Sequence, residues 1–182
     1  MTILLFAIGG LSMLWTASIV IWSIMNPKRR LWPVDEITLV KALYIWVPFV
    51  CMFISIFILG MLDWNRFGWP DYFRWGVGGP LIIIGHIVVY AGVFKIGVSA
   101  TSGAQAHLKI DGLYKWSRNP QYVADIAIFA GWIILSASLL ALPLALAGIG
   151  LLLLAPLSEE PWLRDVYGKS YEDYCQRVRR YL

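Results

Sequence analysis

Long runs of apolar residues are the feature that most constrains what this chain can fold into. The first run, Ile3 to Met25, contains no charged side chain. At ~1.5 Å per helical residue it is about 34 Å long, enough to cross the hydrocarbon core of a bilayer. Charged residues make up only 14% of the chain, whereas they account for about a quarter of a typical soluble domain. The sequence therefore predicts an all-α, polytopic membrane protein.

Three further apolar runs follow, over Ile37 to Leu62, Gly76 to Gly97 and Tyr122 to Pro156. As one helix the last run would be about 52 Å long, well beyond the thickness of a bilayer core. It contains Pro143, and a proline inside a helix removes a hydrogen-bond donor and clashes with the preceding turn. We therefore predict that this run folds back as a hairpin of two shorter helices, which gives five transmembrane helices.

The distribution of positive charge supports five spans. With five, every Lys and Arg except Arg66 and Arg74 lies on one side of the membrane. With one helix over Tyr122 to Pro156, the basic residues of the C-terminal tail would move to the other side. Because Lys and Arg concentrate in cytoplasmic loops, we predict that the N-terminus lies outside and that the tail is cytoplasmic.

The predicted organisation is a single membrane domain, residues 1–182. Three N-terminal spans occupy residues 1–97, and a polar loop, the hairpin and the tail occupy residues 98–182. No Lys or Arg precedes the first run, so we expect a retained helix and not a signal peptide. Trp32 lies beside the first cytoplasmic loop, and we interpret it as an interfacial aromatic residue without a chemical role.

A polar segment, Asp111 to Tyr122, lies between the third run and the hairpin. Pro120 favours the start of a helix at this point, and the free N–H groups of a helix start can bind an anion. Arg118 offers a planar guanidinium for the same anion. The alternative is that Arg118 is an interfacial anchor that extends toward lipid headgroups.

A second polar block begins at Glu159 and Glu160, directly after the last apolar run. Adjacent side chains on a helix point about 100° apart, so at most one of these carboxylates can face a given pocket. The alternative is a purely structural role, in which Ser158 caps the tail helix and the acids favour its N-terminus. From Trp162 to Tyr181 the spacing of apolar residues predicts an amphipathic helix, with a turn favoured at Gly168.

Asp125 and His86 are titratable residues within the apolar runs. Asp125 would be costly against lipid, so we expect it to face protein or a water-filled cavity and treat it as a candidate site residue. His86 is expected to form an interhelical hydrogen bond. The two cysteines, Cys51 and Cys175, have no Cys/His spacing of a metal site, and we predict no metal and no nucleic-acid partner.

The two polar blocks together resemble the integral-membrane methyltransferases, the superfamily of isoprenylcysteine carboxyl methyltransferases and phospholipid N-methyltransferases. The first block reads Gly112-Leu113-Tyr114, then Arg118-Asn119-Pro120-Gln121-Tyr122. The second reads Glu159-Glu160, then Tyr167-Gly168, with Tyr171 and Tyr174 after it. Asn119 stands where the family has His, Ala124 where it has Gly, and Tyr167 where it has Phe. Asn cannot act as an acid or base near neutral pH, so a titrating group at that position is not expected here.

The resemblance implies a methyl transfer from S-adenosylmethionine to a lipophilic or amphiphilic acceptor at the cytoplasmic membrane face. That acceptor would be an isoprenylcysteine-like carboxylate or a phospholipid amine. By analogy, Arg118 would hold the carboxylate of the cofactor and Glu160 its ammonium group or ribose. The expected catalytic residues are Arg118, Glu160 and Asp125. The expected cofactor pocket consists of His107, Gly112, Tyr114, Arg118, Asn119, Tyr122, Glu159 and Glu160.

Two other functions stay open at this point. Sterol-type reductases resemble this C-terminal region but use a nicotinamide cofactor. A non-enzymatic scaffold or lipid-binding module would need only the basic tail and the interfacial tryptophans. The identity of the acceptor and the oligomeric state do not follow from the sequence.

Overall fold

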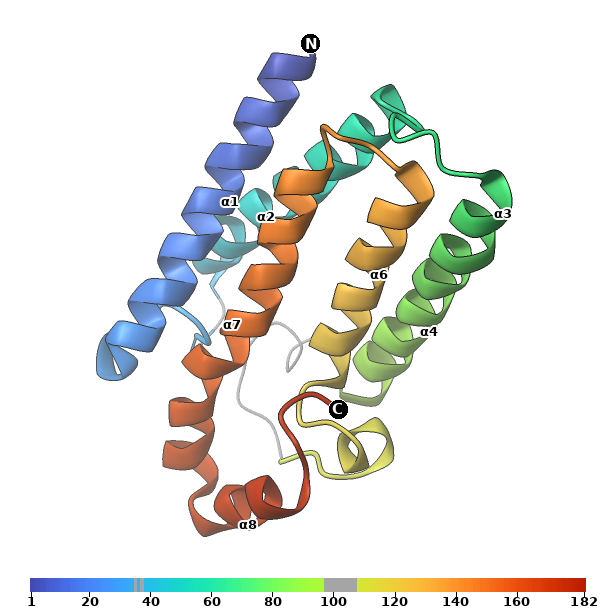
Figure 1. Cartoon of the computed structure of the whole chain (residues 1–182). Helices are drawn as coiled ribbons and strands as arrows, with labels where there is room; N and C mark the ends of the chain where they lie inside the picture. The colour runs from blue at the N-terminus through green and yellow to red at the C-terminus, as the bar shows by residue number, and fades with distance from the viewer. Residues whose placement is uncertain (35, 37, 97–107) are drawn as a thin grey trace.

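The computed structural model describes residues 1–34, 36, 38–96 and 108–182 (Figure 1). The long helices are α1 (Thr2–Met25), α2 (Leu39–Leu62), α4 (Gly79–Ile96), α6 (Pro120–Ser136), α7 (Leu142–Tyr167) and the shorter α8 (Lys169–Arg177). Short turns of helix join them: η1 (Pro27–Arg29), α3 (Asp71–Phe73), η2 (Arg74–Gly78) and η3 (Gly112–Lys115). The prediction of an all-α fold is confirmed.

Four helical stretches in the described part of the chain are long and apolar enough to cross a membrane: Thr2–Met25, Leu39–Leu62, Asp71–Gly92 and Leu142–Tyr167. The chain is an integral, polytopic membrane protein. The remaining predicted span, α6, is apolar but has 17 residues, or about 26 Å at ~1.5 Å per residue. In Figure 1 it runs between α4 and α7 through the same layer. Its role as a fifth span stays a prediction.

The predicted hairpin is confirmed, because α6 and α7 are joined by a short turn and pack against each other. The turn is fastened by the loop that follows α2. Asp63 Oδ2 accepts hydrogen bonds from Ser138 Oγ and from the Leu140 N–H, both at 3.0 Å. Arg74 donates to the carbonyl of Leu135 from Nε at 2.9 Å and from Nη2 at 2.7 Å. A last-turn carbonyl of α6, which has no partner within the helix, is thereby satisfied.

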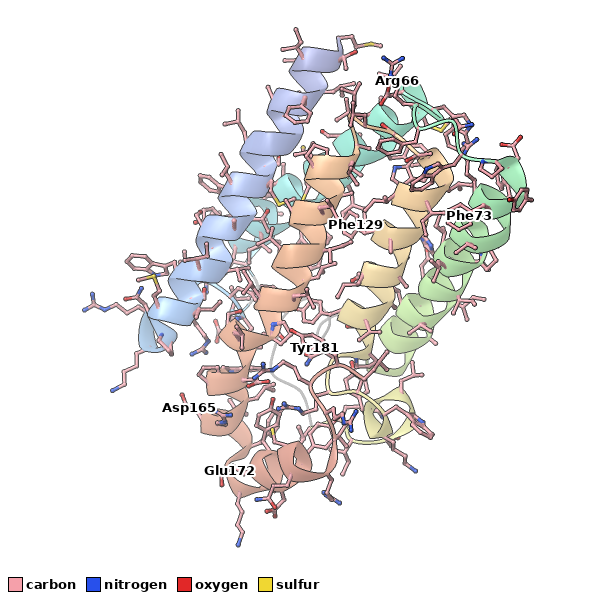
Figure 2. All side chains as sticks on the ribbon, viewed as in Figure 1. Arg66, Phe73, Phe129, Asp165, Glu172 and Tyr181 are labelled. Carbon is pink, nitrogen blue, oxygen red and sulfur yellow. The ribbon has the colours of Figure 1, made fainter. Side chains whose placement is uncertain are left out.

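Small residues allow α4 and α6 to approach closely. A Cβ atom at Gly78 would lie 2.8 Å from the carbonyl oxygen of Gly131, and one at Gly85 would lie 2.8 Å from that of Ala124. Small residues at helix contacts are typical of membrane proteins, where van der Waals packing drives association. Apolar side chains fill the centre of the bundle, among them Phe129, which Figure 2 labels between α6 and α7.

Helix α7 does not end where the apolar run ends, and the alternative in which Ser158 caps a separate tail helix is wrong. Helix α7 continues past Pro156 and Pro161 to Tyr167, and Ser158 is not a cap but donates to the carbonyl of Ala155 at 2.7 Å inside the helix. A proline costs one backbone hydrogen bond, and in membrane proteins packing and neighbouring groups compensate for that cost. Here Tyr181 Oη donates to the Leu153 carbonyl at 2.5 Å, next to the interruption.

The amphipathic tail helix is shorter than predicted. It begins after Gly168, where the chain turns with φ 51°, and consists of α8 alone. Tyr171 and Tyr174 form its buried face, while Lys169 and Glu172 are exposed. Figure 2 shows Glu172 and Asp165 at the end of the bundle opposite to Arg66. The tail therefore lies at the same end as η3, as predicted from the hairpin (Figure 1).

Candidate active site

The polar segment between α4 and α6 begins with η3, which Gly112 enters at φ 61°. The carbonyl of Tyr114 accepts a hydrogen bond from Tyr174 Oη at 2.6 Å, which fixes η3 on α8. Helix α6 then starts at Pro120, as predicted. Burial raises the pKa of Tyr174 to about 12 and also raises the pKa of Tyr114. Both phenols therefore stay protonated at neutral pH, when they can donate hydrogen bonds but cannot act as bases.

The last residues of the chain fold back onto the Arg-Asn-Pro motif. The Arg118 N–H donates to the carbonyl of Arg179 at 2.9 Å. The Arg180 carbonyl accepts from Asn119 Nδ2 at 2.9 Å and from Ser117 Oγ at 3.3 Å. The amide of Asn119 therefore acts as a donor that fixes the C-terminal end of the chain. This use requires no titrating group, in agreement with the replacement of His by Asn.

Glu160 lies in a buried cluster of positive charge, with an exposed fraction of 5%. Arg180 binds it with both branches of its guanidinium, from Nε to Oε1 at 2.7 Å and from Nη2 to Oε2 at 3.0 Å. Arg118 Nη1 lies 3.2 Å from Oε1, and Arg164 Nη2 lies 3.8 Å from Oε2. The hydrogen bond to Glu160 raises the pKa of Arg180. A buried carboxylate needs such partners, and here they come from the protein itself.

Glu159 points in a different direction from Glu160, as expected for neighbours on a helix. Its Oε1 accepts a hydrogen bond from Trp32 Nε1 at 2.7 Å and another from Tyr122 Oη. Glu159 lines the main cavity of the protein, whereas Glu160 does not. The question of which acid faces the pocket, left open by the sequence, is thus answered for this structure: it is Glu159.

The cavity has a volume of about 490 Å³, within the range of roughly 300–1,000 Å³ typical of small-molecule sites. One part is walled by apolar residues of α1, α2 and α7, such as Ile19, Phe49 and Leu151. The other part contains polar groups from η3, the start of α6 and the end of α7. It therefore suits a ligand, or a pair of ligands, with both apolar and charged parts.

Two polar nitrogen atoms at this cavity are buried and have no hydrogen-bond partner among the residues that the structure describes: Nε of Arg118 and Nε2 of Gln121. Buried polar groups without a partner are rare, and each calls for an explanation such as an absent ligand. The Arg118 side chain is only 11% exposed. Its Nη1 contacts Glu160, Cys175 and Tyr171, while its Nε retains the capacity to donate.

The structure brings together most of the predicted site residues. Those that line the cavity are Tyr114, Arg118, Asn119, Tyr122, Asp125 and Glu159. Gly112 belongs to η3 but does not line the cavity, and Glu160 lies behind Arg118. His107 falls outside the described residues. His86 hydrogen-bonds the carbonyl of Ile82 in its own helix at 2.8 Å and is exposed, so the expected bond to another helix is wrong.

Sequence reasoning missed Trp32 and Gln121. Trp32 was interpreted as an interfacial residue, yet its indole lines the cavity and binds Glu159. No motif surrounds it, and only the folded contact reveals it. Gln121 was within the motif, and its place one helical turn before Asp125 was a usable signal, because residues at i and i+4 share a helix face.

These features define a class: an integral membrane protein with a partly apolar cavity of ligand size, lined by an arginine and a carboxylate. The phospholipid methyltransferase family matches residues 73–170, a stretch from α3 to the start of α8 that includes the first motif and, of the second, Glu159-Glu160 and Tyr167-Gly168. The chain belongs to this family, which is part of the superfamily of membrane methyltransferases, and it is an S-adenosylmethionine-dependent methyltransferase. No curated protein and no solved structure matches the chain.

The residues of the cavity fit S-adenosylmethionine, a zwitterion with a carboxylate, an ammonium group and ribose hydroxyls. The unused donor of Arg118 suits the carboxylate. No described residue donates to Oε2 of Glu159, so this oxygen can accept from an ammonium group or a hydroxyl. When bound, the cofactor would supply a methyl group attached to a positively charged sulfur. That sulfur would leave with the electrons of the C–S bond as an atom of the acceptor bonded to the methyl carbon.

Proposed function

We propose that this protein methylates the amine of a phospholipid headgroup at the membrane face that carries η3 and α8. The observation that carries the proposal is the single cavity that joins a polar end, with Arg118 and Glu159, to an apolar part between α1, α2 and α7. Membership in the phospholipid methyltransferase family favours this function over the nicotinamide-dependent reductase and the non-enzymatic scaffold.

Arg118, Tyr122 and Glu159 are the proposed cofactor-binding residues, and Asn119 would support the site indirectly by holding the C-terminal end of the chain. Arg118 would hold the carboxylate of S-adenosylmethionine, and Glu159 its ammonium group or ribose. Glu160 would act indirectly, because its ion pair with Arg118 and its bidentate contact with Arg180 keep the Arg118 guanidinium in place. His107, Gly112 and Tyr114 stay as further candidates from the resemblance.

Asp125 favours an amine over a carboxylate as the acceptor. It lines the cavity one helical turn beyond Gln121, so both side chains project from the same face of α6. A carboxylate at this place attracts an ammonium group and repels the carboxylate of an isoprenylcysteine. It can also accept the proton that the amine must lose before its nitrogen can attack. The apolar walls would receive an acyl chain and keep water from the reacting atoms.

The proposed orientation places the active site and the C-terminus in the cytoplasm and the N-terminus outside. The support is the positive charge at the end of the bundle that carries η1, η3 and α8, including Lys28, Lys109 and Arg177. At the opposite end the basic side chains are Arg66 and Arg74, and Arg74 is used within the protein.

The function is tested with radiolabelled S-adenosylmethionine. We expect label in lipid from vesicles of phosphatidylethanolamine, and none with phosphatidylglycerol vesicles or with an isoprenylated cysteine. Label in the isoprenylated cysteine alone would overturn the choice of acceptor. Absence of cofactor binding, measured by calorimetry in detergent, would overturn the proposed cofactor site.

The role of Asp125 is tested with Asp125→Asn. Loss of a proton acceptor lowers kcat/KM for the lipid by about 100-fold or more, while the Kd of the cofactor stays unchanged. Asp165→Asn, an exposed acid on α7, is the matched control and should behave as the wild type. Unchanged lipid kinetics in Asp125→Asn would remove Asp125 from the acceptor site.

A further inference from the structure

Trp32 connects the N-terminal half of the chain to the active site. Its indole nitrogen donates to Glu159 Oε1 at 2.7 Å, and the ring lines the cavity. The family match begins only at residue 73, so Trp32 lies outside the stretch that it covers. The contact joins the loop after α1 to the end of α7, over 127 residues of sequence.

The loop that bears Trp32 is held by a buried serine at the end of α1. Ser23 has an exposed fraction of 0%, and its hydroxyl accepts from the N–H groups of Leu31 and Trp32, both at 3.0 Å. The same hydroxyl donates to the Ile19 carbonyl at 2.7 Å. One hydroxyl thus serves three backbone groups, and the backbone of Trp32 is fixed relative to α1.

The ring of Trp32 is also packed on its other side. Trp46 of α2 meets it edge to face, with ring centroids 6.4 Å apart. The neighbouring Arg30 guanidinium lies 5.9 Å from the ring centroid of Trp162 on α7. The indole therefore approaches Glu159 from a loop that contacts α1, α2 and α7, and part of what holds it comes from the N-terminal half of the chain.

The two donors to Glu159 act on the same oxygen. Trp32 and Tyr122 both donate to Oε1, and Oε2 receives no donor from the described residues. With Oε1 fixed by two hydrogen bonds, the carboxylate cannot rotate freely, and its second oxygen stays available on the cavity wall. A site whose polar groups are held in advance loses less entropy when it binds its ligand.

We propose that Trp32 is a positioning residue for cofactor binding: its indole N–H orients Glu159 so that Oε2 is presented to the ammonium group or ribose of S-adenosylmethionine. This inference rests on the proposed role of Glu159. The loop between α1 and α2, which carries Trp32, would then take part in the active site.

The first test is Trp32→Phe, which removes the N–H and retains an aromatic ring. We expect the Kd and KM of S-adenosylmethionine to rise about tenfold, the size of effect expected when one charge-assisted hydrogen bond is lost. The value of kcat should not change, since Glu159 contacts the cofactor away from the reacting methyl group. Trp22→Phe is the matched control, because it also removes an indole hydrogen bond, to the Arg29 carbonyl at 3.0 Å, but away from the cavity.

A purely structural role for Trp32 would give a different result. It would lower the unfolding midpoint and the amount of active enzyme, and thereby kcat, with an unchanged Kd. That pattern would overturn the proposal. Should Trp32→Phe not fold, Ser23→Ala serves as the second variant, because it releases the backbone of Trp32 and keeps the indole. Ser23→Ala should also raise the Kd of S-adenosylmethionine, and an unchanged Kd in this variant would count against the proposal.

A double-mutant cycle with Glu159→Ala separates this inference from the proposed cofactor site. If Trp32 acts through Glu159, Trp32→Phe has no further effect on the Kd once the carboxylate is absent. An equal, additive effect in both backgrounds would overturn the proposal. If Glu159→Ala alone leaves the Kd unchanged, the proposed role of Glu159 fails. If Glu159→Ala weakens binding but Trp32→Phe does not, only the role of Trp32 fails.

Discussion

Arg74 and Arg118 are both arginines of low exposure beside the α6–α7 hairpin, but they lie at opposite ends of α6 and use their donors differently. Arg74, with a side chain 2% exposed, donates from Nε and Nη2 to Leu135 and from Nη1 to Asp71. Its guanidinium also lies 4.6 Å from the ring centroid of Trp64. The side chain of Arg118 contacts Glu160, Cys175 and Tyr171 through Nη1, and its buried Nε has no partner in the described part of the chain.

The difference separates a structural arginine from one suited to ligand binding. Arg74 has each donor nitrogen occupied, by Leu135 in the last turn of α6 and by Asp71 of α3. Arg118 retains a donor, Nε, at the cavity. Burying a guanidinium N–H without a hydrogen-bond partner costs free energy, because the group loses its contact with water. Two residues of the same type and similar burial can thus be assigned opposite roles by counting partners, which residue type and burial alone would not allow.

The largest effect is expected from Arg118→Ala. The variant removes the proposed partner of the cofactor carboxylate, and the Kd of S-adenosylmethionine should rise by about 100-fold or more, as expected for a charged, bidentate interaction. The unfolding midpoint should fall only slightly, because Glu160 keeps its bidentate contact with Arg180. Calorimetry and thermal unfolding in detergent measure the two quantities. A large loss of stability without loss of affinity would make Arg118 equivalent to Arg74.

Arg74→Ala should show the opposite pattern. Removal of the side chain leaves the Leu135 carbonyl without this donor and opens a space beside Trp64, which together lower the free energy of unfolding by about 3 kcal/mol. The Kd of the cofactor should not change. Arg66→Ala is the matched control, because Arg66 is an exposed arginine at the same end of the bundle (Figure 2), and it should leave both quantities unaltered. A weaker affinity for the cofactor in Arg74→Ala would contradict the assignment of Arg74 as structural and Arg118 as ligand-binding.

A smaller effect is expected from Arg180→Gln. Without this partner Glu160 would draw more strongly on Arg118, whose guanidinium would turn away from the cavity, and the Kd should rise about tenfold. Arg179→Gln is the matched control, since Arg179 contacts the motif through its backbone carbonyl and its side chain is exposed. Arg180→Lys should restore only part of the affinity, because an ammonium group cannot reproduce a bidentate contact. Equal binding by all three variants would show that Glu160 and Arg118 act independently of the tail.

The sequence predicted the parts of this site that depend on local signals. The end of the first helix at Met25 and the start of α6 at Pro120 follow from apolar runs and proline. The return of the hairpin follows from the length of its run and from the charge distribution. The proximity of Arg118 to the second polar block follows from that return, and the structure places it 3.2 Å from Glu160.

What the sequence did not predict depends on helix phase and on distant contacts. The directions of Glu159 and Glu160 require knowing that α7 is continuous through Pro156, because a break there would rotate both side chains relative to the hairpin. The contact of Trp32 with Glu159 joins segments with no shared motif. Both depend on tertiary packing, which overrides the local preference of proline and of interfacial tryptophan.

The smallest effect is expected at Asn119, where the family has His. Its Nδ2 donates to the Arg180 carbonyl at 2.9 Å, so its role beside Arg118 is to hold the end of the chain. Asn119→Ala removes this hydrogen bond between uncharged groups and should raise the Kd of the cofactor only about fivefold, since such a bond contributes roughly 1 kcal/mol. Asn119→His can donate one N–H from a neutral ring and should bind as the wild type does. The pH profile of kcat decides between this role and a role in catalysis. A new ionisation near pH 6.5 in Asn119→His, together with a higher kcat, would mean that the residue at this position takes part in proton transfer.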